Sequence, residues 1–419
     1  MAATSADASD RFLSLDVVRG VAVMGILTMN IAGFALIFPA YFNPLAQGDA
    51  TVADRIVYLV NFVLFDGKMR GLFSMLFGAS MLVVIERAEA KGELASRVHL
   101  LRMAWLLAFG LAHLWLVWWG DILSHYAIVG VIAFAFHRAG IRTLLLVGAL
   151  LVLYQCWVNA GIAVAVFRLE AALGDPAGAT AAAKTLASFN RSFGIPDAEF
   201  VARQWAIYRG NYGGIITDRF ARHGLAAIND LAYLAAETLA YMLFGMAALK
   251  AGLLRGEWTQ ARYRRWAFFG FAIALPVYCA LAVYLWQADF SLRATVLALF
   301  AVPTPVRPVM ILGWACLILA LMRPGRALTA RIAAAGQMAF TNYLATSLIC
   351  TSLFYGYGLG WFGRLHRAEL YLVVVAVWAA MLLWSMPWLA RHRYGPMEWL
   401  WRSLSRRLIE PMRRVAVGI

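Results

Sequence analysis

The fold is decided by residues 14–38, which read SLDVVRGVAVMGILTMNIAGFALIF. This stretch exceeds the roughly 20 predominantly apolar residues that a helix needs to cross a bilayer. It nevertheless carries Asp16 and Arg19 near its start and Asn30 in its interior. Ionisable groups inside a membrane span cost free energy unless they are paired or wetted, so they indicate a functional cavity. The stretch therefore predicts a membrane protein with a polar site between its helices.

The composition of the whole chain favours the same class. Of 419 residues, 63% are hydrophobic and 14% are charged, whereas a soluble domain carries about 25% charged residues. The formal net charge of +15 does not indicate nucleic-acid binding, because the basic residues lie mostly in short loops. We therefore expect an all-α, polytopic integral membrane protein with about ten transmembrane helices.

Apolar segments and loops divide the chain into five parts. We expect a disordered tail over 1–13, an N-terminal membrane region over 14–167, a long extracytoplasmic loop over 168–223, a C-terminal membrane region over 224–390 and a basic amphipathic cytoplasmic tail over 391–419. The ten expected spans lie near 14–38, 54–86, 102–119, 122–137, 143–167, 226–250, 266–287, 306–323, 333–356 and 369–389. The helix count is ambiguous in 54–86 and 288–306. Within 54–86 we expect a helix break at Asp66-Gly67.

The loops alternate in their content of Lys and Arg. Loops assigned to the inner side are rich in basic residues, and the short loops assigned to the outer side carry few. Positive charge holds short loops in the cytoplasm, so both chain termini are predicted to be cytoplasmic.

Two clusters of charged residues each have two possible explanations. One cluster lies near the predicted inner side, and the other lies at the predicted helix break. Asp16 and Arg19 share a helix face and form either a salt bridge or an anchor for an anionic ligand, since Arg binds phosphate and carboxylate through its planar fork. Asp66, Lys68 and Arg70 form either local ion pairs at the break or a polar gate that contacts substrate.

A possible catalytic group lies in residues 110–130, GLAHLWLVWWGDILSHYAIVG. His113 is either a buried core histidine or a base whose tautomer Asp121 fixes. Eight residues of helix span about 12 Å, so a direct bond between the two is expected only if the turn at Gly120-Asp121 folds back. His125, on the returning helix, is expected to be the closer partner of Asp121.

Other polar side chains lie within apolar segments. Asn30 either bonds to a neighbouring helix or orients a carbonyl group. Asn342 and Tyr343 favour a polar seam between helices, with substrate contact as the alternative. No metal site and no nucleotide-binding loop is found in the sequence.

Three segments together resemble the YeiB-like bacterial membrane proteins, which have a C-terminal domain of unknown function. They are residues 11–31 (RFLSLDVVRGVAVMGILTMNI), 120–130 (GDILSHYAIVG), and 336–360 with 393–404 (GQMAFTNYLATSLICTSLFYGYGLG and RYGPMEWLWRSL). The resemblance covers nearly the whole chain. It implies a multi-pass protein of the bacterial cytoplasmic (inner) membrane.

A more distant resemblance concerns residues 15–30, LDVVRGVAVMGILTMN. They are similar to the start of the catalytic region in heparan-alpha-glucosaminide N-acetyltransferases and to the opening of OafA-type membrane O-acyltransferases. Asp16, Arg19, Gly20 and Asn30 fall on matching positions. The acetyltransferases have a histidine in the loop after the first span, and the loop at 39–54 has none. His113 is then the nearest candidate base.

This second resemblance implies acyl transfer from cytoplasmic acyl-CoA, as co-substrate, to an acceptor at or across the membrane, with no covalently bound cofactor. The catalytic candidates are His113, Asp121 and Asn30. The substrate-binding candidates are Asp16, Arg19, Asp66, Lys68, Arg70, His125, Asn342 and Tyr343. Expected partners are membrane lipids, a lipid-linked, glycan or small-molecule acceptor, and a second copy of the chain, with no nucleic acid. A transporter or permease for a small or lipid-like solute and a non-catalytic membrane protein remain the alternatives.

Overall fold

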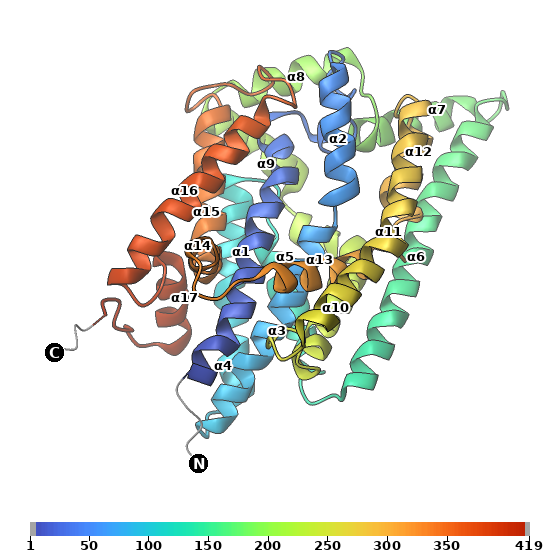
Figure 1. The fold of residues 1–419 in the computed structure, drawn as a ribbon. Coiled ribbons are helices and arrows are strands. Elements are labelled where there is room, and N and C mark those ends of the chain that lie inside the picture. Colours follow the sequence, from blue (N-terminus) through green and yellow to red (C-terminus); the bar gives the residue numbers. More distant parts are fainter. Residues whose placement is uncertain (1–5, 415–419) are drawn as a thin grey trace.

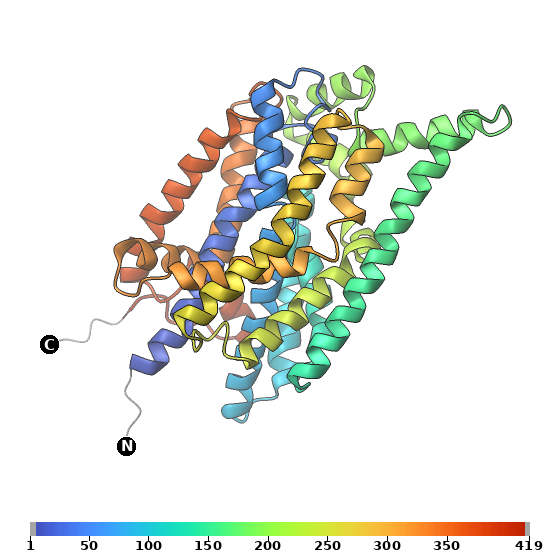
Figure 2. The same cartoon turned by 45° about the vertical axis from the view of Figure 1, so that its right-hand side comes forward.

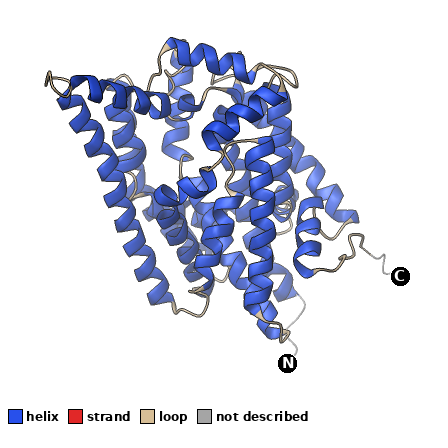
Figure 3. Ribbon diagram, turned by 180° about the vertical axis from the view of Figure 1, so that it is seen from behind, coloured by secondary structure: helices blue, strands red, loops and turns tan. Residues whose placement is uncertain are grey.

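The computed structural model describes residues 6–414, and in that range the chain is helical, with no strand beyond one isolated bridge between His392 and Arg413 (Figures 1 and 3). The helices are α1 (Ala6–Ala35), α2 (Val52–Leu64), α3 (Lys68–Ala90), α4 (Ala95–Ala112), α5 (Leu123–Phe134), α6 (Ile141–Ala172), α7 (Ala179–Phe193), α8 (Ala198–Tyr208), α9 (Tyr212–His223), α10 (Ala226–Lys250), α11 (Gln260–Gln287), α12 (Leu292–Val296), α13 (Arg307–Leu321), α14 (Ala327–Gln337), α15 (Ala339–Phe354), α16 (Leu370–Arg391) and α17 (Pro396–Arg406).

Seven helical segments in the described part of the chain are long and apolar enough to cross a membrane, as expected of a membrane protein. They are Leu13–Ala35, Val52–Ala90, Ala95–Val117, Ile141–Ala172, Ala226–Lys250, Gln260–Gln287 and Leu370–Arg391. Three shorter apolar segments accompany them: Leu123–Phe134, Leu292–Ala301 and Arg307–Leu321. The expected span at 333–356 is divided at Met338 between α14 and α15. The count of ten stays a prediction.

The expected break in 54–86 is confirmed. A capping box between Thr51 and Asp54 starts α2, and α3 begins at Lys68 after a turn. Gly67 has φ +68°, a conformation that favours glycine, and a Cβ there would lie 2.6 Å from Nε of Arg307. The break therefore leaves room for a charged side chain from another part of the bundle.

Two further helices change their winding before they end. α4 passes into a π-helical segment, His113–Val117, and α12 continues as a second one, Leu297–Ala301. π-Helical turns are rare and often lie at functional sites. Irregular backbone at membrane depth is tolerated where it is buried in protein or lines a wet cavity. The fold thus concentrates its irregular backbone around the polar residues described below.

Close contacts between glycines and backbone hold the centre of the bundle. A Cβ at Gly245 of α10 would lie 1.8 Å from the carbonyl oxygen of Met75, and one at Gly78 of α3 would lie 2.1 Å from that of Met242. The same packing joins α1 to α14, since a Cβ at Gly20 would lie 2.1 Å from the carbonyl oxygen of Ile332. Small residues allow such approach between membrane helices.

The two ends of the bundle differ. The start of α1 and the end of α17 lie at one end, and α7, α8 and α9 cover the other (Figures 1 and 2). These three helices occupy most of the segment 168–223 that the sequence marks as one long polar loop. At the opposite end, α1 already begins at Ala6, inside the segment 1–13 expected to be disordered. Residues 1–5 and 415–419 of the predicted tails lie outside the described residues.

Candidate functional site

The centre of the candidate site is a histidine–carboxylate pair. Nδ1 of His113 lies 2.9 Å from Oδ1 of Asp121, and both side chains are buried. The other carboxylate oxygen of Asp121 accepts hydrogen bonds from the backbone N–H and the hydroxyl of Ser124, at 2.8 and 2.6 Å. The carboxylate is therefore held from both sides, and the imidazole is oriented by it.

The local fold explains how residues eight positions apart come into contact. Gly110 lets α4 and α5 cross closely, because a Cβ there would lie 2.2 Å from the backbone nitrogen of Ser124. The backbone of Trp118 is extended at the end of the π-helical segment. Its ring stacks on Phe34, with ring centroids 3.9 Å apart. It also donates from Nε1 to the carbonyl of Gly33. The turn thus folds back, which is the condition under which the sequence predicted a direct bond between His113 and Asp121.

Asp121 uses only one of the two ring nitrogens of His113. Nε2 of His113 is buried and has no hydrogen-bond partner among the described residues. The ring packs against Tyr343 of α15, with centroids 5.3 Å apart, and Tyr343 donates to the carbonyl of Gly120 at 3.3 Å. An imidazole bound through Nδ1 to a carboxylate and free at Nε2 can take or give a proton there.

His125 is not part of this pair. Its Nε2 lies 3.0 Å from the hydroxyl of Thr238 in α10, and its Nδ1 is buried without a partner in the described chain. The expectation that His125 is the closer partner of Asp121 is wrong, because Asp121 is occupied by His113 and Ser124. His125 ties α5 to α10 instead.

Asn30 lies in a separate contact on α1. Its Oδ1 accepts a hydrogen bond from the hydroxyl of Tyr41 at 3.4 Å. Asn30 also lines a cavity of about 10 Å³ between α1 and α15, together with Tyr343 and Ser347. A cavity of this size holds at most one water. Tyr343 therefore joins the two candidate groups, touching the ring of His113 on one side and the cavity at Asn30 on the other.

A cluster of charged side chains joins three helices. Arg70 of α3 and Arg307 of α13 both bind the carboxylate of Glu237 in α10. The hydroxyl of Tyr241 donates to the same carboxylate at 2.8 Å. Nε of Arg307 is buried with no partner in the described residues. The ion pairs expected among neighbours at the break are thus replaced by a pairing with a distant residue, since Arg70 turns to α10.

Lys68 and Asp66 complete the polar region at the break. Lys68 is fully buried, and its Nζ donates to the carbonyl of Phe62 at 2.5 Å. The same nitrogen lies 3.3 Å from the centroid of the Tyr278 ring, a cation–π contact. Asp66 lies in the turn between α2 and α3, where its backbone N–H donates to the carbonyl of Asn61 at 2.9 Å. This region lies next to the Glu237 cluster and is separate from the His113 pair.

The pair at the start of α1 is an ion pair. Nη1 of Arg19 lies 2.8 Å from Oδ1 of Asp16, and Nη2 donates to the hydroxyl of Ser80 at 2.7 Å. The Arg19 side chain is 23% exposed. Its guanidinium therefore has internal partners as well as a face towards solvent, and the salt bridge expected from the sequence is present.

Asn342 forms the polar seam expected from the sequence. Its amide nitrogen donates to the carbonyl of Ala335 at 3.0 Å and to the hydroxyl of Ser385 at 3.2 Å. Its Oδ1 accepts from Nε1 of Trp384 at 3.0 Å. Fully engaged and buried, Asn342 joins α14, α15 and α16, and its contacts are those of a structural residue.

Three polar residues near these groups were not singled out in the sequence. Glu237 is the carboxylate of the charge cluster, Arg307 is its second arginine, and Tyr41 contacts Asn30. A lone Glu inside the apolar segment 226–250 is a visible signal, because intramembrane carboxylates are rare. Tyr41 lies in the loop after the first span, and no sequence pattern distinguishes it from the other aromatic residues there.

Comparison with known proteins gives relatives over almost the full length. The chain is 32% identical over 410 residues to the "Uncharacterized protein YeiB" of Escherichia coli (strain K12), covering 96% of this chain and 98% of that protein. It is 31% identical over 421 residues to the "Uncharacterized protein YxaH" of Bacillus subtilis (strain 168), covering 94% of each. A family model described as "Protein of unknown function (DUF418)" matches residues 248–407. No solved structure matches the chain.

Proposed function

The chain belongs to the YeiB family of bacterial membrane proteins, and on this premise we propose that it is a membrane acyltransferase. In this proposal it lies in the cytoplasmic (inner) membrane with both termini in the cytoplasm. It transfers an acyl group from cytoplasmic acyl-CoA to a hydroxyl or amine of an acceptor at the outer side. The acceptor is lipid-linked, a glycan or a small molecule.

One observation carries the proposal: His113 is oriented by Asp121 at 2.9 Å and keeps a free Nε2. A general base needs a fixed tautomer, a nearby negative charge that stabilises the imidazolium, and an unoccupied nitrogen. The pair supplies all three. His125 also has one buried ring nitrogen without a partner in the described residues, but its other nitrogen contacts the hydroxyl of Thr238 rather than a carboxylate, so the hydrogen bond to Asp121 is what distinguishes His113.

The chemistry follows from that geometry. The acceptor O–H or N–H gives its proton to Nε2 of His113 as its oxygen or nitrogen attacks the thioester carbonyl carbon. The C–S bond breaks, and the imidazolium returns the proton to the leaving thiolate, which leaves as CoA thiol. Asp121 stabilises the imidazolium between the two transfers. The amide nitrogen of Asn30 is the proposed donor to the carbonyl oxygen of the acyl group.

The proposal gives the two ends of α1 different roles. Arg19 and Asn30 are eleven residues apart, which is about 16 Å along a helix. Arg19 at the inner end is the proposed contact for the phosphates of CoA, using the exposed part of its guanidinium. The acyl end would reach Asn30 through the small cavity between α1 and α15, so binding requires these helices to separate.

A transporter remains the second candidate, and a specific observation favours it. The charges of Arg70, Glu237 and Arg307 meet where α2–α3 and the α12–α13 segment are interrupted. Transporters commonly place solute and ion sites at such interrupted helices. In this alternative Glu237 exchanges its arginine partners for a solute or a proton.

The test is acyl transfer by purified protein from radiolabelled acetyl-CoA to lipid and glycan acceptors extracted from the host membrane. We expect His113→Gln to lower the rate about 10²–10⁴-fold with unchanged membrane insertion. His137→Ala and His392→Ala serve as controls, since Nδ1 of each histidine bonds to a carbonyl of its own segment, and Nε2 of His137 also lies 3.8 Å from the Glu89 carboxylate, away from the candidate site. Full transfer by His113→Gln removes His113 from catalysis. Solute uptake into proteoliposomes without transfer supports the transporter instead.

A further inference from the structure

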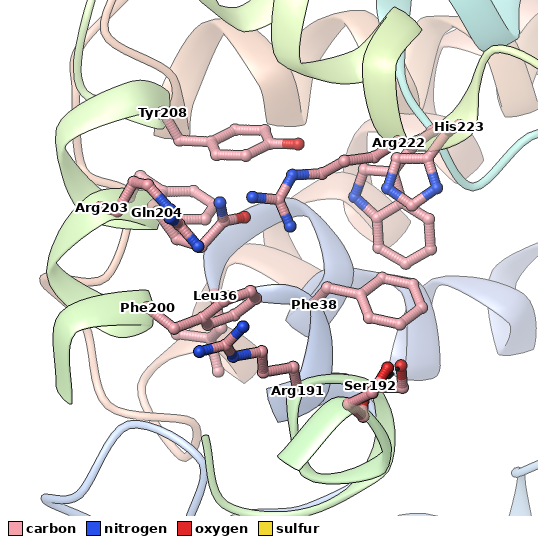
Figure 4. A pocket seen from close by; sticks show the side chains of 13 residues that line it. Leu36, Phe38, Arg191, Ser192, Phe200, Arg203, Gln204, Tyr208, Arg222 and His223 are labelled. Carbon is pink, nitrogen blue, oxygen red and sulfur yellow. Dashed lines mark hydrogen bonds between the residues drawn. The ribbon is translucent and has the colours of Figure 1, made fainter. Parts of the chain in front are cut away.

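A second cavity lies at the end of the molecule opposite the chain termini. Its volume is about 310 Å³, and it lies between the cap helices α7–α9 and the top of α1. Figure 4 shows the side chains of Tyr208 and Gln204 extending into it from one side, Arg222 from the opposite side beside His223, and Arg191 from below. Ligand sites in proteins begin at about 300 Å³, so the cavity fits a compact ligand.

The lining is basic. Arg191, Arg203 and Arg222 surround the ring of Phe200, with guanidinium carbons 5.8, 5.7 and 5.3 Å from its centroid. No lining residue in the described chain is acidic. Arg191 and Arg222 each pair with a carboxylate outside the lining, Asp197 and Asp218, and Arg203 adds a third positive charge, so the lining keeps an excess of positive charge that attracts anions.

Donors remain available after the internal ion pairs are counted. Arg222 uses Nε for Asp218, and Arg191 uses Nε and Nη2 for a single oxygen of Asp197. The terminal nitrogens of Arg222 have no partner in the described residues. Nε2 of Gln204 is buried, with the residue only 2% exposed, and has no partner in the described part of the chain. A buried amide donor without a partner costs free energy, which a bound acceptor group would recover.

The other wall is aromatic and uncharged. Trp119 stacks on His223 with centroids 5.5 Å apart and an angle of 22°, and Phe38 packs on Trp119 at 4.8 Å. Burial is the main cause that lowers the pKa of His223 to about 4, with Arg222 and Arg219 acting in the same direction and Asp218 against it. The ring is therefore neutral at neutral pH, and this wall offers flat faces for stacking.

The cavity is next to the catalytic candidate. Trp119 lines it, and the preceding residue, Trp118, packs on the ring of His113 with centroids 6.4 Å apart. Phe38 and Leu36, at the top of α1, also line it. A ligand in the cavity is thus separated from the His113–Asp121 turn by one layer of aromatic side chains.

We propose that this cavity binds a phosphate group joined to a sugar-sized ring, as the acceptor site of the protein. The role of the bound molecule as acceptor rests on the proposed function, whereas the binding site itself does not. Donors from α7, α8 and α9 converge from different sides, which suits the tetrahedral oxygens of phosphate better than the two coplanar oxygens of a carboxylate. The ring stacks on Trp119. The phosphate belongs either to a free sugar phosphate or to a lipid headgroup.

The test measures binding without acyl-CoA. Purified full-length protein in detergent is titrated calorimetrically with glucose 6-phosphate, glucose, glucuronate and inorganic phosphate. Native mass spectrometry of protein from mixed phosphatidylinositol and phosphatidylcholine nanodiscs covers the lipid source, because the inositol headgroup joins a phosphate to a sugar-sized ring. The variants are Arg222→Gln and Gln204→Leu, with Arg264→Gln, an exposed arginine of α11, as the control of equal charge change.

We expect glucose 6-phosphate to bind at least about tenfold more tightly than glucose, and Arg222→Gln to lose about 10- to 100-fold, with Arg264→Gln unchanged. Selective retention of phosphatidylinositol that Arg222→Gln abolishes assigns the phosphate to a lipid headgroup. Preference for glucuronate overturns the phosphate assignment. If wild type and Arg222→Gln bind every probe equally, the proposal that this cavity is the binding site is wrong.

The same titration in His113→Gln separates the two proposals. Unchanged binding in that variant supports the site independently of catalysis. Binding without any acyl transfer by wild type contradicts the proposed function alone, and transfer without binding of any phosphate probe contradicts this inference alone.

Discussion

The imidazole of His113 and the carboxylate of Asp121 lie 2.9 Å apart on either side of a turn that folds α5 back against α4. Neither side chain has more than 1% of its surface exposed. A polar pair buried this completely is held by its own hydrogen bonds, so its geometry depends on each member.

Asp121→Asn should lower acyl transfer while the protein stays folded. The amide keeps the size of the carboxylate but loses the negative charge that stabilises the imidazolium, as in other histidine–carboxylate pairs. We expect a fall in the turnover rate of at least about tenfold, with little change in the concentration dependence on acyl-CoA. Asp49→Asn, at an exposed aspartate in the loop after α1, is the control. Wild-type turnover in Asp121→Asn would show that the pair is structural.

Glu237→Gln should destabilise the protein, because it leaves the buried Arg307 and the partly buried Arg70 without their carboxylate. Removing one member of a buried ion pair costs about 3–5 kcal/mol. The thermal denaturation midpoint in detergent measures the effect. The double variant Glu237→Gln with Arg307→Met, which removes one of the stranded charges, should recover part of the loss. Equal midpoints for Glu237→Gln and wild type would contradict the electrostatic role of the cluster.

Gly245→Ala should be among the most damaging substitutions of a small residue. Its Cβ would lie 1.8 Å from the carbonyl oxygen of Met75, so α3 and α10 must move apart. Overpacking costs typically about 1–3 kcal/mol. Gly161→Ala in α6, where a Cβ meets nothing within 4 Å, is the matched control and should leave the denaturation midpoint unchanged or raise it. The reverse order of the two variants would show that the helices do not pack as described.

His223 should make stability depend on pH. Its pKa of about 4 in the folded protein lies below the ordinary 6.5, so between these values the unfolded chain binds a proton that the folded chain does not. Stability is therefore lost as pH falls from about 6.5 to about 4. In His223→Gln the difference in denaturation midpoint between about pH 7.5 and about pH 4.5 should shrink. His392→Gln is the control and should keep the wild-type difference in denaturation midpoint. The same difference in His223→Gln would show that the His223 ring is not buried.

Reporter fusions should place both termini in the cytoplasm. The basic residues of the predicted inner loops supply the reason. Fusions after Ile141 and at Ile419 should both report the cytoplasm, and an insertion after Ala177, at the start of the α7–α9 cap, should report the periplasm. A periplasmic signal at Ile419 would reverse the C-terminal half of the topology.

The fold class could be predicted because it depends on local properties of the chain. Long apolar runs define membrane helices wherever they occur, and Asp66-Gly67 marks a break because a polar residue and a glycine interrupt such a run. The ion pair of Asp16 with Arg19 was also accessible, since residues three apart share a helix face. The same applies to the seam at Asn342, whose neighbours on α15 are polar.

Other features depend on which helices meet, and no local signal specifies that. Local ion pairing was one of the two explanations that the sequence left open for Arg70, and its carboxylate instead comes from Glu237, 167 residues away. The cavity among α7, α8 and α9 joins arginines that appear in the sequence as separate charges of one polar segment. His113 reaches Asp121 only because Gly110 permits α4 and α5 to approach. The sequence by itself determined the class of protein and the places where polar groups enter the membrane. Only the tertiary structure decided which of those groups meet, because pairing between helices depends on side-chain shape at contacts far apart along the chain.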